Sequence, residues 1–173
     1  MNSNINKLNR ISHSPWYWLL LLTGSFAAIA IALFYQYHFE DLPCVLCIHV
    51  RLWLSLLMMM SLIGLLNWEN RVFNSFLHLT VVAVAGALTE RSYQLLGTER
   101  GFVFGECNFD LGLPAWFTVD EWLPWLYRVE TSCGYTPELL FGITMAEALI
   151  VMSVGLLLVG LTMFISSLFK TLR

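Results

Sequence analysis

Two cysteines with two residues between them are the strongest chemical signal in this 173-residue sequence. Cys44 and Cys47 follow Pro43 directly, and Cys-x-x-Cys spacing is typical of redox and metal-binding sites. Cys107 and Cys133 complete the set of four cysteines, with 25 residues between them. Four cysteines allow three pairings, and spacing alone does not choose among them.

Other uses of these cysteines fit the sequence less well than redox chemistry. A disulfide within the Cys-x-x-Cys motif closes a very small ring, which removes little chain entropy. A four-cysteine zinc site usually has a second close pair, which is absent here. Haem attachment needs a histidine directly after the motif, but Ile48 stands there and His49 follows it. A thioredoxin fold needs βαβ elements, which the sequence does not show.

Long apolar runs provide the elements that hold the cysteines. The chain is 58% hydrophobic and 12% charged, whereas soluble domains are about 45–50% apolar and about 25% charged. A helix of about 20 apolar residues crosses a bilayer, and the strict alternation of membrane β-strands is absent. The sequence therefore predicts an all-α membrane protein, a four-transmembrane-helix bundle forming a single membrane domain over residues 1–173. The helices are expected at about 16–37, 44–66, 72–96 and 139–169.

Charge distribution predicts the orientation of the bundle. Basic residues gather on one side, at Lys7, Arg10, Arg71, Lys170 and Arg173. The opposite loops, about 38–43 and 97–138, are poor in bases, and the long one has seven acids. The positive-inside rule then puts both termini in the cytoplasm and all four cysteines on the outer, oxidising side. A net charge of −3 without a basic run argues against nucleic-acid binding.

The long outer loop is expected to stay close to the bilayer. Its stretch Val119–Val129 is rich in aromatic residues. This pattern fits a short interfacial helix lying on the membrane surface, and it equally fits aromatic side chains that pack on the helix ends.

Three further polar side chains lie within the apolar runs. Arg51 follows Cys47 by four residues, so Cys44, Cys47 and Arg51 share one helical face. An intramembrane arginine is costly without a partner or a task, and we expect Arg51 to stabilise a thiolate rather than only snorkel. His49 falls on a different face and is interpreted as a packing or interfacial residue. Glu147 is expected either to pair with an arginine across the bundle or to transfer protons. No metal site is expected.

These features together resemble the disulfide bond formation protein B (DsbB) family of bacterial inner-membrane quinone reductases. The resemblance extends from Trp16 to about Phe169. It rests on four spans, on an arginine four residues after the second cysteine and on the pieces Pro43-Cys44-Val45-Leu46-Cys47-Ile48, Cys107-Asn108-Phe109, Leu113-Pro114-Ala115-Trp116-Phe117 and Asp120-Glu121-Trp122-Leu123-Pro124.

The resemblance implies a membrane thiol:quinone oxidoreductase that sustains disulfide formation in exported proteins. It implies redox disulfides Cys44–Cys47 and Cys107–Cys133, a periplasmic DsbA-like thiol oxidase as partner, and ubiquinone or menaquinone as cofactor. It also implies quinone binding by Cys47, Arg51 and Arg91. The stretch from Arg91 to Cys107 is shorter than in the best-known members, which is consistent with a specialised paralogue.

The family's electron relay can be carried over to the four cysteines. The reduced partner attacks Cys107 and frees Cys133, which attacks Cys44 and releases Cys47. Cys133 is then expected to move between two partners, with Gly134 as a candidate hinge.

Two rival functions remain open at this point. One is a reductase of a small quinone-like molecule in the manner of vitamin K epoxide reductase, although in that family the Cys-x-x-Cys motif usually lies on the last helix. The other is a non-catalytic membrane chaperone or assembly subunit whose disulfides only brace the outer loop.

Overall fold

The computed structural model describes residues 14–103, 110–114, 116–140 and 142–171. Within these ranges, four helices are long and apolar enough to cross a membrane. They are α2 (Pro15–His38), α3 (Val45–Leu66), α4 (Arg71–Arg100) and α7 (Met145–Thr171). The predicted four-helix membrane bundle is therefore confirmed.

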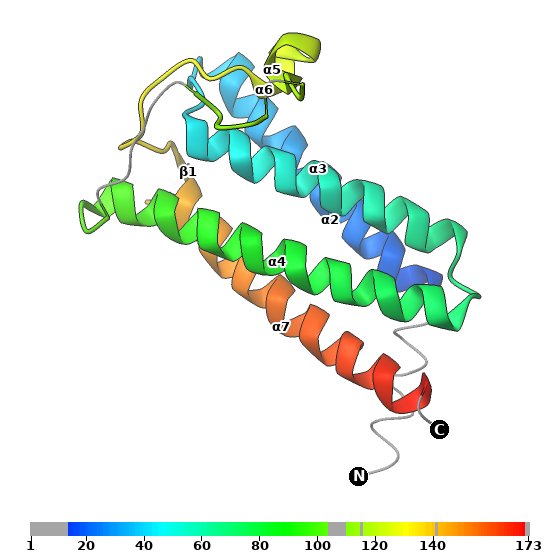
Figure 1. Ribbon diagram of the computed structural model, residues 1–173. Coiled ribbons are helices and arrows are strands. Elements are labelled where there is room, and N and C mark those ends of the chain that lie inside the picture. Colours follow the sequence, from blue (N-terminus) through cyan, green and yellow to red (C-terminus); the bar gives the residue numbers. More distant parts are fainter. Residues whose placement is uncertain (1–13, 104–109, 115, 141, 172–173) are drawn as a thin grey trace.

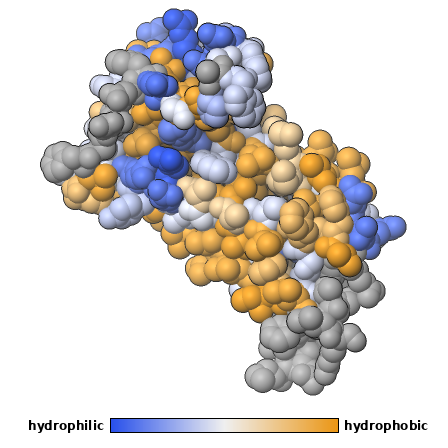
Figure 2. Space-filling view, viewed as in Figure 1, coloured by the Kyte–Doolittle hydropathy of each residue, from blue (hydrophilic) through white to orange (hydrophobic). Residues whose placement is uncertain are grey.

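The helices form a bundle in which α4 packs along α7, while α3 packs against both α2 and α4 (Figure 1). Hydrophobic residues cover much of the side of the bundle in Figure 2. Large hydrophobic side chains on the bundle surface include Phe26, Leu62 and Val151, which are 63%, 48% and 73% exposed. Such a surface is stable in lipid, where helices satisfy their own backbone groups.

Local capping explains where α2 and α4 begin and where α4 ends. The Ser14 side chain accepts a hydrogen bond from the Trp16 N–H (3.3 Å), and Pro15 occupies the first turn of α2. Asn70 caps α4 in the same way. The helix α4 continues four residues beyond the predicted end, and it stops at Gly101, whose φ of 75° is left-handed.

The fourth long helix begins later than the predicted residue 139. A short antiparallel hairpin precedes it, formed by β1 (Glu138–Leu140) and β2 (Ile143–Thr144). The turn contains Gly142 at a φ of 76°. The outer loop is therefore shifted to residues 101–144, because apolar residues after 138 pair as strands instead of continuing the helix.

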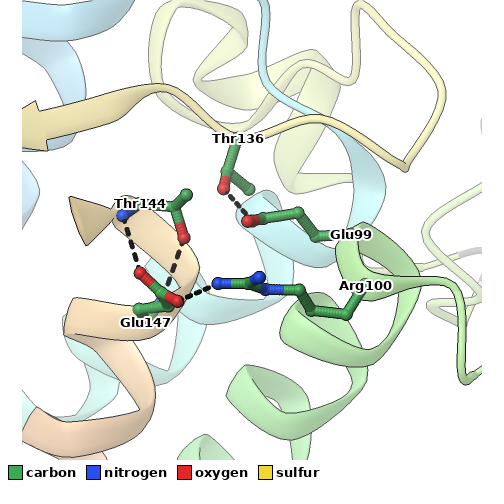
Figure 3. Close-up of polar contacts among 5 residues, drawn as sticks. All are labelled: Glu99, Arg100, Thr136, Thr144 and Glu147. Carbon is green, nitrogen blue, oxygen red and sulfur yellow. Dashed lines mark hydrogen bonds and ion pairs between the residues drawn. The ribbon is translucent and has the colours of Figure 1, made fainter. Parts of the chain in front are cut away.

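Thr144 and Glu147 define the start of α7 as a capping box (Figure 3). The Thr144 N–H donates to Glu147 Oε2 (3.1 Å), and the Glu147 N–H donates to Thr144 Oγ1 (3.3 Å). The same carboxylate forms an ion pair with Arg100 at the end of α4. The expected pairing of Glu147 with an arginine across the bundle is therefore confirmed. Beside this pair, the Thr136 hydroxyl donates to the Glu99 carboxylate, which ties the loop to α4.

The aromatic stretch of the loop forms two one-turn helices, α5 (Val119–Trp122) and α6 (Pro124–Tyr127), rather than the single predicted helix. Pro124 has no N–H to continue the first turn, so the chain restarts there. Tyr127 is buried, and its hydroxyl donates to Ser55 Oγ (2.7 Å). Trp122 points outward and is 61% exposed. The expected packing on the helix ends is therefore confirmed for Tyr127, and the position of this segment on the membrane surface stays a prediction.

Candidate functional site

Cys44 and Cys47 face each other at the first turn of α3. Cys44 is the N-cap residue, and its Sγ accepts a hydrogen bond from the Cys47 N–H (3.4 Å). Both are free thiols, with their Sγ atoms 2.9 Å apart. Since a disulfide bond measures about 2.05 Å, the pair can close with a small shift of the sulfurs.

The hydrogen bonds at Cys44 make it acidic. The hydrogen bond with the Cys47 side chain lowers the pKa of Cys44 to about 7, although burial of the side chain opposes the shift. Backbone N–H groups of the first turn act in the same direction. A thiolate is the nucleophile in disulfide exchange, so Cys44 is activated near neutral pH.

Arg51 lies one turn beyond Cys47 and is only 5% exposed. Its Nη1 donates to Gln36 Oε1 (2.6 Å) and to the Leu126 carbonyl (3.0 Å), and its Nη2 donates to the Ala32 carbonyl (3.4 Å). None of the carboxylates in the described ranges forms an ion pair with it. The neutral partners orient the guanidinium without cancelling its charge, so it can still stabilise an anion.

Gln36 was not among the residues predicted for the site. It is buried on α2, and a short connection separates α2 from α3 in the sequence. The available signal was a lone amide near the end of an otherwise apolar run, which also fits an interfacial residue.

A cleft between α2, α3 and α7 is lined by the side chains of Cys47 and Arg51. Cys47, Val50, Arg51 and Leu54 line it from one face of α3, as the predicted spacing requires. The space measures about 930 Å³, including its open mouth, and most of its lining is apolar. This confirms that Cys47 and Arg51 lie on a common face.

The segment before Cys133 is paired with the start of α3. The Glu130 and Thr131 N–H groups both donate to the Pro43 carbonyl (3.0 and 3.3 Å), and Thr131 forms a parallel bridge with Cys44. Cys133 itself packs against the core cluster that includes Cys44. The loop therefore holds Cys133 near the Cys-x-x-Cys pair.

The pairing of Cys107 with Cys133 stays a prediction, because Cys107 lies outside the described residues. Cys133 is disulfide-bonded, whereas Cys44 and Cys47 are free thiols. This combination is consistent with the predicted pairing.

Arg91 and His49 lie on the other side of α3, in a second cavity between α3 and α4. The His49 Nε2 donates to the Leu111 carbonyl (3.0 Å), and the Arg91 Nη1 donates to Gln94 Oε1 (2.9 Å). The predicted different face for His49 is confirmed. Arg91 does not line the cleft that contains Cys47 and Arg51, so quinone contact by Arg91 stays a prediction without support from this geometry.

Comparison with known proteins decides the family. The model of the family described as "Disulfide bond formation protein DsbB" matches residues 14–163. The chain belongs to the DsbB family. It is 32% identical to disulfide bond formation protein B of Psychromonas ingrahamii over 170 residues, covering 95% of this chain and 89% of that protein.

Further relatives give the same result. Disulfide bond formation protein B of Shewanella sp. (strain MR-4) is 31% identical over 90% of this chain and 89% of its own length. Disulfide bond formation protein B 2 of Pseudomonas aeruginosa is 28% identical over 75% of this chain and 78% of its own length. The DsbB protein described here is thus a transmembrane, disulfide-forming oxidoreductase.

Proposed function

We propose that this DsbB protein is a thiol:quinone oxidoreductase of the bacterial inner membrane that reoxidises a periplasmic, DsbA-like thiol oxidase. One observation carries the proposal. Cys47 and Arg51 line the same apolar cleft. Cys44, which is hydrogen-bonded to the Cys47 thiol, pairs with the segment that leads to Cys133. A donor pair, an acceptor cleft and the loop cysteine Cys133 therefore adjoin one another.

The cleft suits a quinone, either ubiquinone or menaquinone. Its lining is mostly apolar, as in the binding sites of small molecules. Apolar side chains of α2 and α7 suit a ring and its hydrocarbon tail, and the Arg51 guanidinium offers donors to a ring oxygen. A bound quinone would supply a two-electron acceptor.

The relay begins with the loop cysteines. A thiolate of the reduced partner attacks Cys107, which forms an intermolecular disulfide and releases Cys133 as a thiolate. Cys133 attacks Cys44, so the Cys44–Cys47 bond breaks and Cys47 leaves as a thiolate. The second thiol of the partner then displaces Cys107, and the oxidised partner departs. Cys107 attacks Cys133, which restores the loop disulfide and leaves Cys44 and Cys47 reduced.

At the end of that sequence Cys133 is again in a disulfide and the helix pair is reduced. Closing the Cys44–Cys47 disulfide then gives up two electrons and two protons, which match the requirement of quinone reduction. When Cys44 is engaged with Cys133, the negative charge lies on Cys47. Arg51, one turn away on the same face, stabilises that charge, so no counterion from solvent is needed.

The test separates an enzyme from a bracing protein. The purified protein is assayed for bound quinone by extraction, and then for quinone reduction with a reduced thioredoxin-like oxidase as donor. We expect stoichiometric transfer, and reduced cysteines accumulating when quinone is removed. Cysteines that stay oxidised with the reduced donor and without quinone would overturn the proposal.

Trapping distinguishes the two loop cysteines. With the oxidised partner supplied, we expect Cys133→Ser to form a mixed disulfide, because the free Cys107 thiolate attacks the partner's disulfide and no second loop thiol is present to displace it. Cys107→Ser should abolish capture of a partner variant that lacks its resolving cysteine. Normal capture by Cys107→Ser would contradict the assigned entry point.

A further inference from the structure

The second cavity is a long groove between α3 and α4, here called the α3–α4 groove. From α3 it is lined by side chains at helical spacing, including Leu46, His49, Trp53, Leu56 and Met59. These positions span about 20 Å at 1.5 Å per residue. The groove is open along one side, and most of its lining is apolar. Its shape fits a hydrocarbon chain laid along α3.

The end of the α3–α4 groove near the loop is polar and carries both signs of charge. Arg91 and Asp110 line it, and neither forms an ion pair within the described part of the chain. Arg91 is held by Gln94, a neutral partner. An intramembrane arginine of this kind points to a ligand or a functional role.

His49 adds a specific requirement at the same end. Its Nε2 donates to the Leu111 carbonyl, so its Nδ1 is an acceptor. That Nδ1 is buried and has no hydrogen-bond partner among the described residues. A buried acceptor without a donor is costly. A ligand that supplies an N–H or O–H donor beside an anion would satisfy both His49 and Arg91.

We propose that the α3–α4 groove binds a zwitterionic phospholipid with a primary ammonium group, such as phosphatidylethanolamine. The phosphate contacts Arg91, the ammonium donates to His49 Nδ1 and faces Asp110, and one acyl chain follows α3 toward Met59. An uncharged quinone leaves the charges at this end unmatched. A choline headgroup has no N–H for His49, and an anionic headgroup meets Asp110 without a positive charge.

The first test compares headgroups on the unmodified protein. The full chain in detergent is titrated with phosphatidylethanolamine, phosphatidylcholine and phosphatidylglycerol of identical acyl chains, and bound lipid is counted by native mass spectrometry. We expect phosphatidylethanolamine to bind about tenfold more tightly than the other two, as expected for one charge-assisted hydrogen bond. Equal binding of the three lipids would overturn the proposal.

The second test uses matched variants. Arg91→Gln should weaken phosphatidylethanolamine binding about tenfold, whereas Arg128→Gln, at an exposed loop arginine outside the groove, should leave it unchanged. His49→Phe should remove the preference for ethanolamine over choline. Circular dichroism checks that each variant is folded. The assignment would be contradicted if folded Arg91→Gln bound the lipid as before. It would also be contradicted if the variant kept its lipid and lost its extractable quinone.

Discussion

The helices α2 and α3 pack differently at their two ends. At the end that carries the cysteines they leave a cleft beside Arg51. There the Arg51 guanidinium donates a hydrogen bond to Gln36 of α2. At the opposite end the fully buried Trp18 ring fills the space above Gly64, where a Cβ would lie 2.4 Å from a ring carbon. One helix pair thus opens at the proposed quinone site and is closely packed at its other end. Changes at the open end should alter turnover, and changes at the closed end should alter stability.

The largest effect at the open end is expected from Cys47→Ser. Without this sulfur the Cys44–Cys47 disulfide cannot form, so quinone reduction by a reduced partner should fall to the uncatalysed rate. The partner should still form a mixed disulfide with the loop, since that step uses other cysteines. Steady-state quinone reduction and gel analysis of trapped complexes measure both. Residual turnover with this variant would mean that electrons reach the quinone by another route.

Arg51→Ala should be the next most severe change. Removing a charge that stabilises a developing anion costs about 10²–10³-fold in rate. Arg51→Lys should recover only part of the rate, because an ammonium lacks the planar fork that contacts Gln36 and the carbonyls. The measurement is steady-state kinetics with quinone and partner varied separately. A defect confined to the apparent KM for the partner would show that Arg51 has a different role.

Gln36→Leu tests whether orientation of the arginine matters apart from its charge. The 2.6 Å hydrogen bond to Arg51 would be lost, and hydrogen bonds to charged groups contribute about 1.5–3 kcal/mol. We expect roughly tenfold weaker quinone binding, with partner capture unchanged. Quinone affinity like that of the unmodified protein would limit the role of Gln36 to packing.

Gly64→Ala should affect the closed end alone. The added methyl group meets the Trp18 ring, and overpacking of this kind costs about 1–3 kcal/mol. Thermal unfolding in detergent should report the loss, while turnover per folded molecule stays the same. Gly24→Ala is the matched control, because nothing lies within 4 Å of its Cβ. That control should be neutral or stabilising by up to about 1 kcal/mol. A turnover defect in folded Gly64→Ala would show that the two ends are coupled.

The smallest expected change is a shift in the titration of Cys44. The thiolate is the form present above the pKa, so its ultraviolet absorbance in the reduced protein should rise as the pH increases through about 7. Cys47→Ala removes the thiol that shares a hydrogen bond with Cys44 and should move this rise toward the usual range of about 8.5. An unchanged midpoint in that variant would assign the low pKa to the helix start alone.

Much of this protein was predictable because the bilayer restricts the choices of the chain. Long apolar runs must form helices, since each backbone group needs an internal partner, and the four spans follow. The shared face of Cys47 and Arg51 depends only on helical periodicity, so local sequence was sufficient. The capping box of Thr144 and Glu147 is also a local pattern and could have corrected the predicted start of α7.

Tertiary structure decided which distant groups meet. Arg51 takes partners that lie 15 and 75 residues away in the chain, at Gln36 and at the Leu126 carbonyl. The pairing of Thr131 with Cys44, and the side of α3 on which Arg91 lies, are equally non-local. Periodicity fixes the direction of a side chain around its own helix, but it does not say which helix packs there. That choice depends on how all the helices and the loop fill space together.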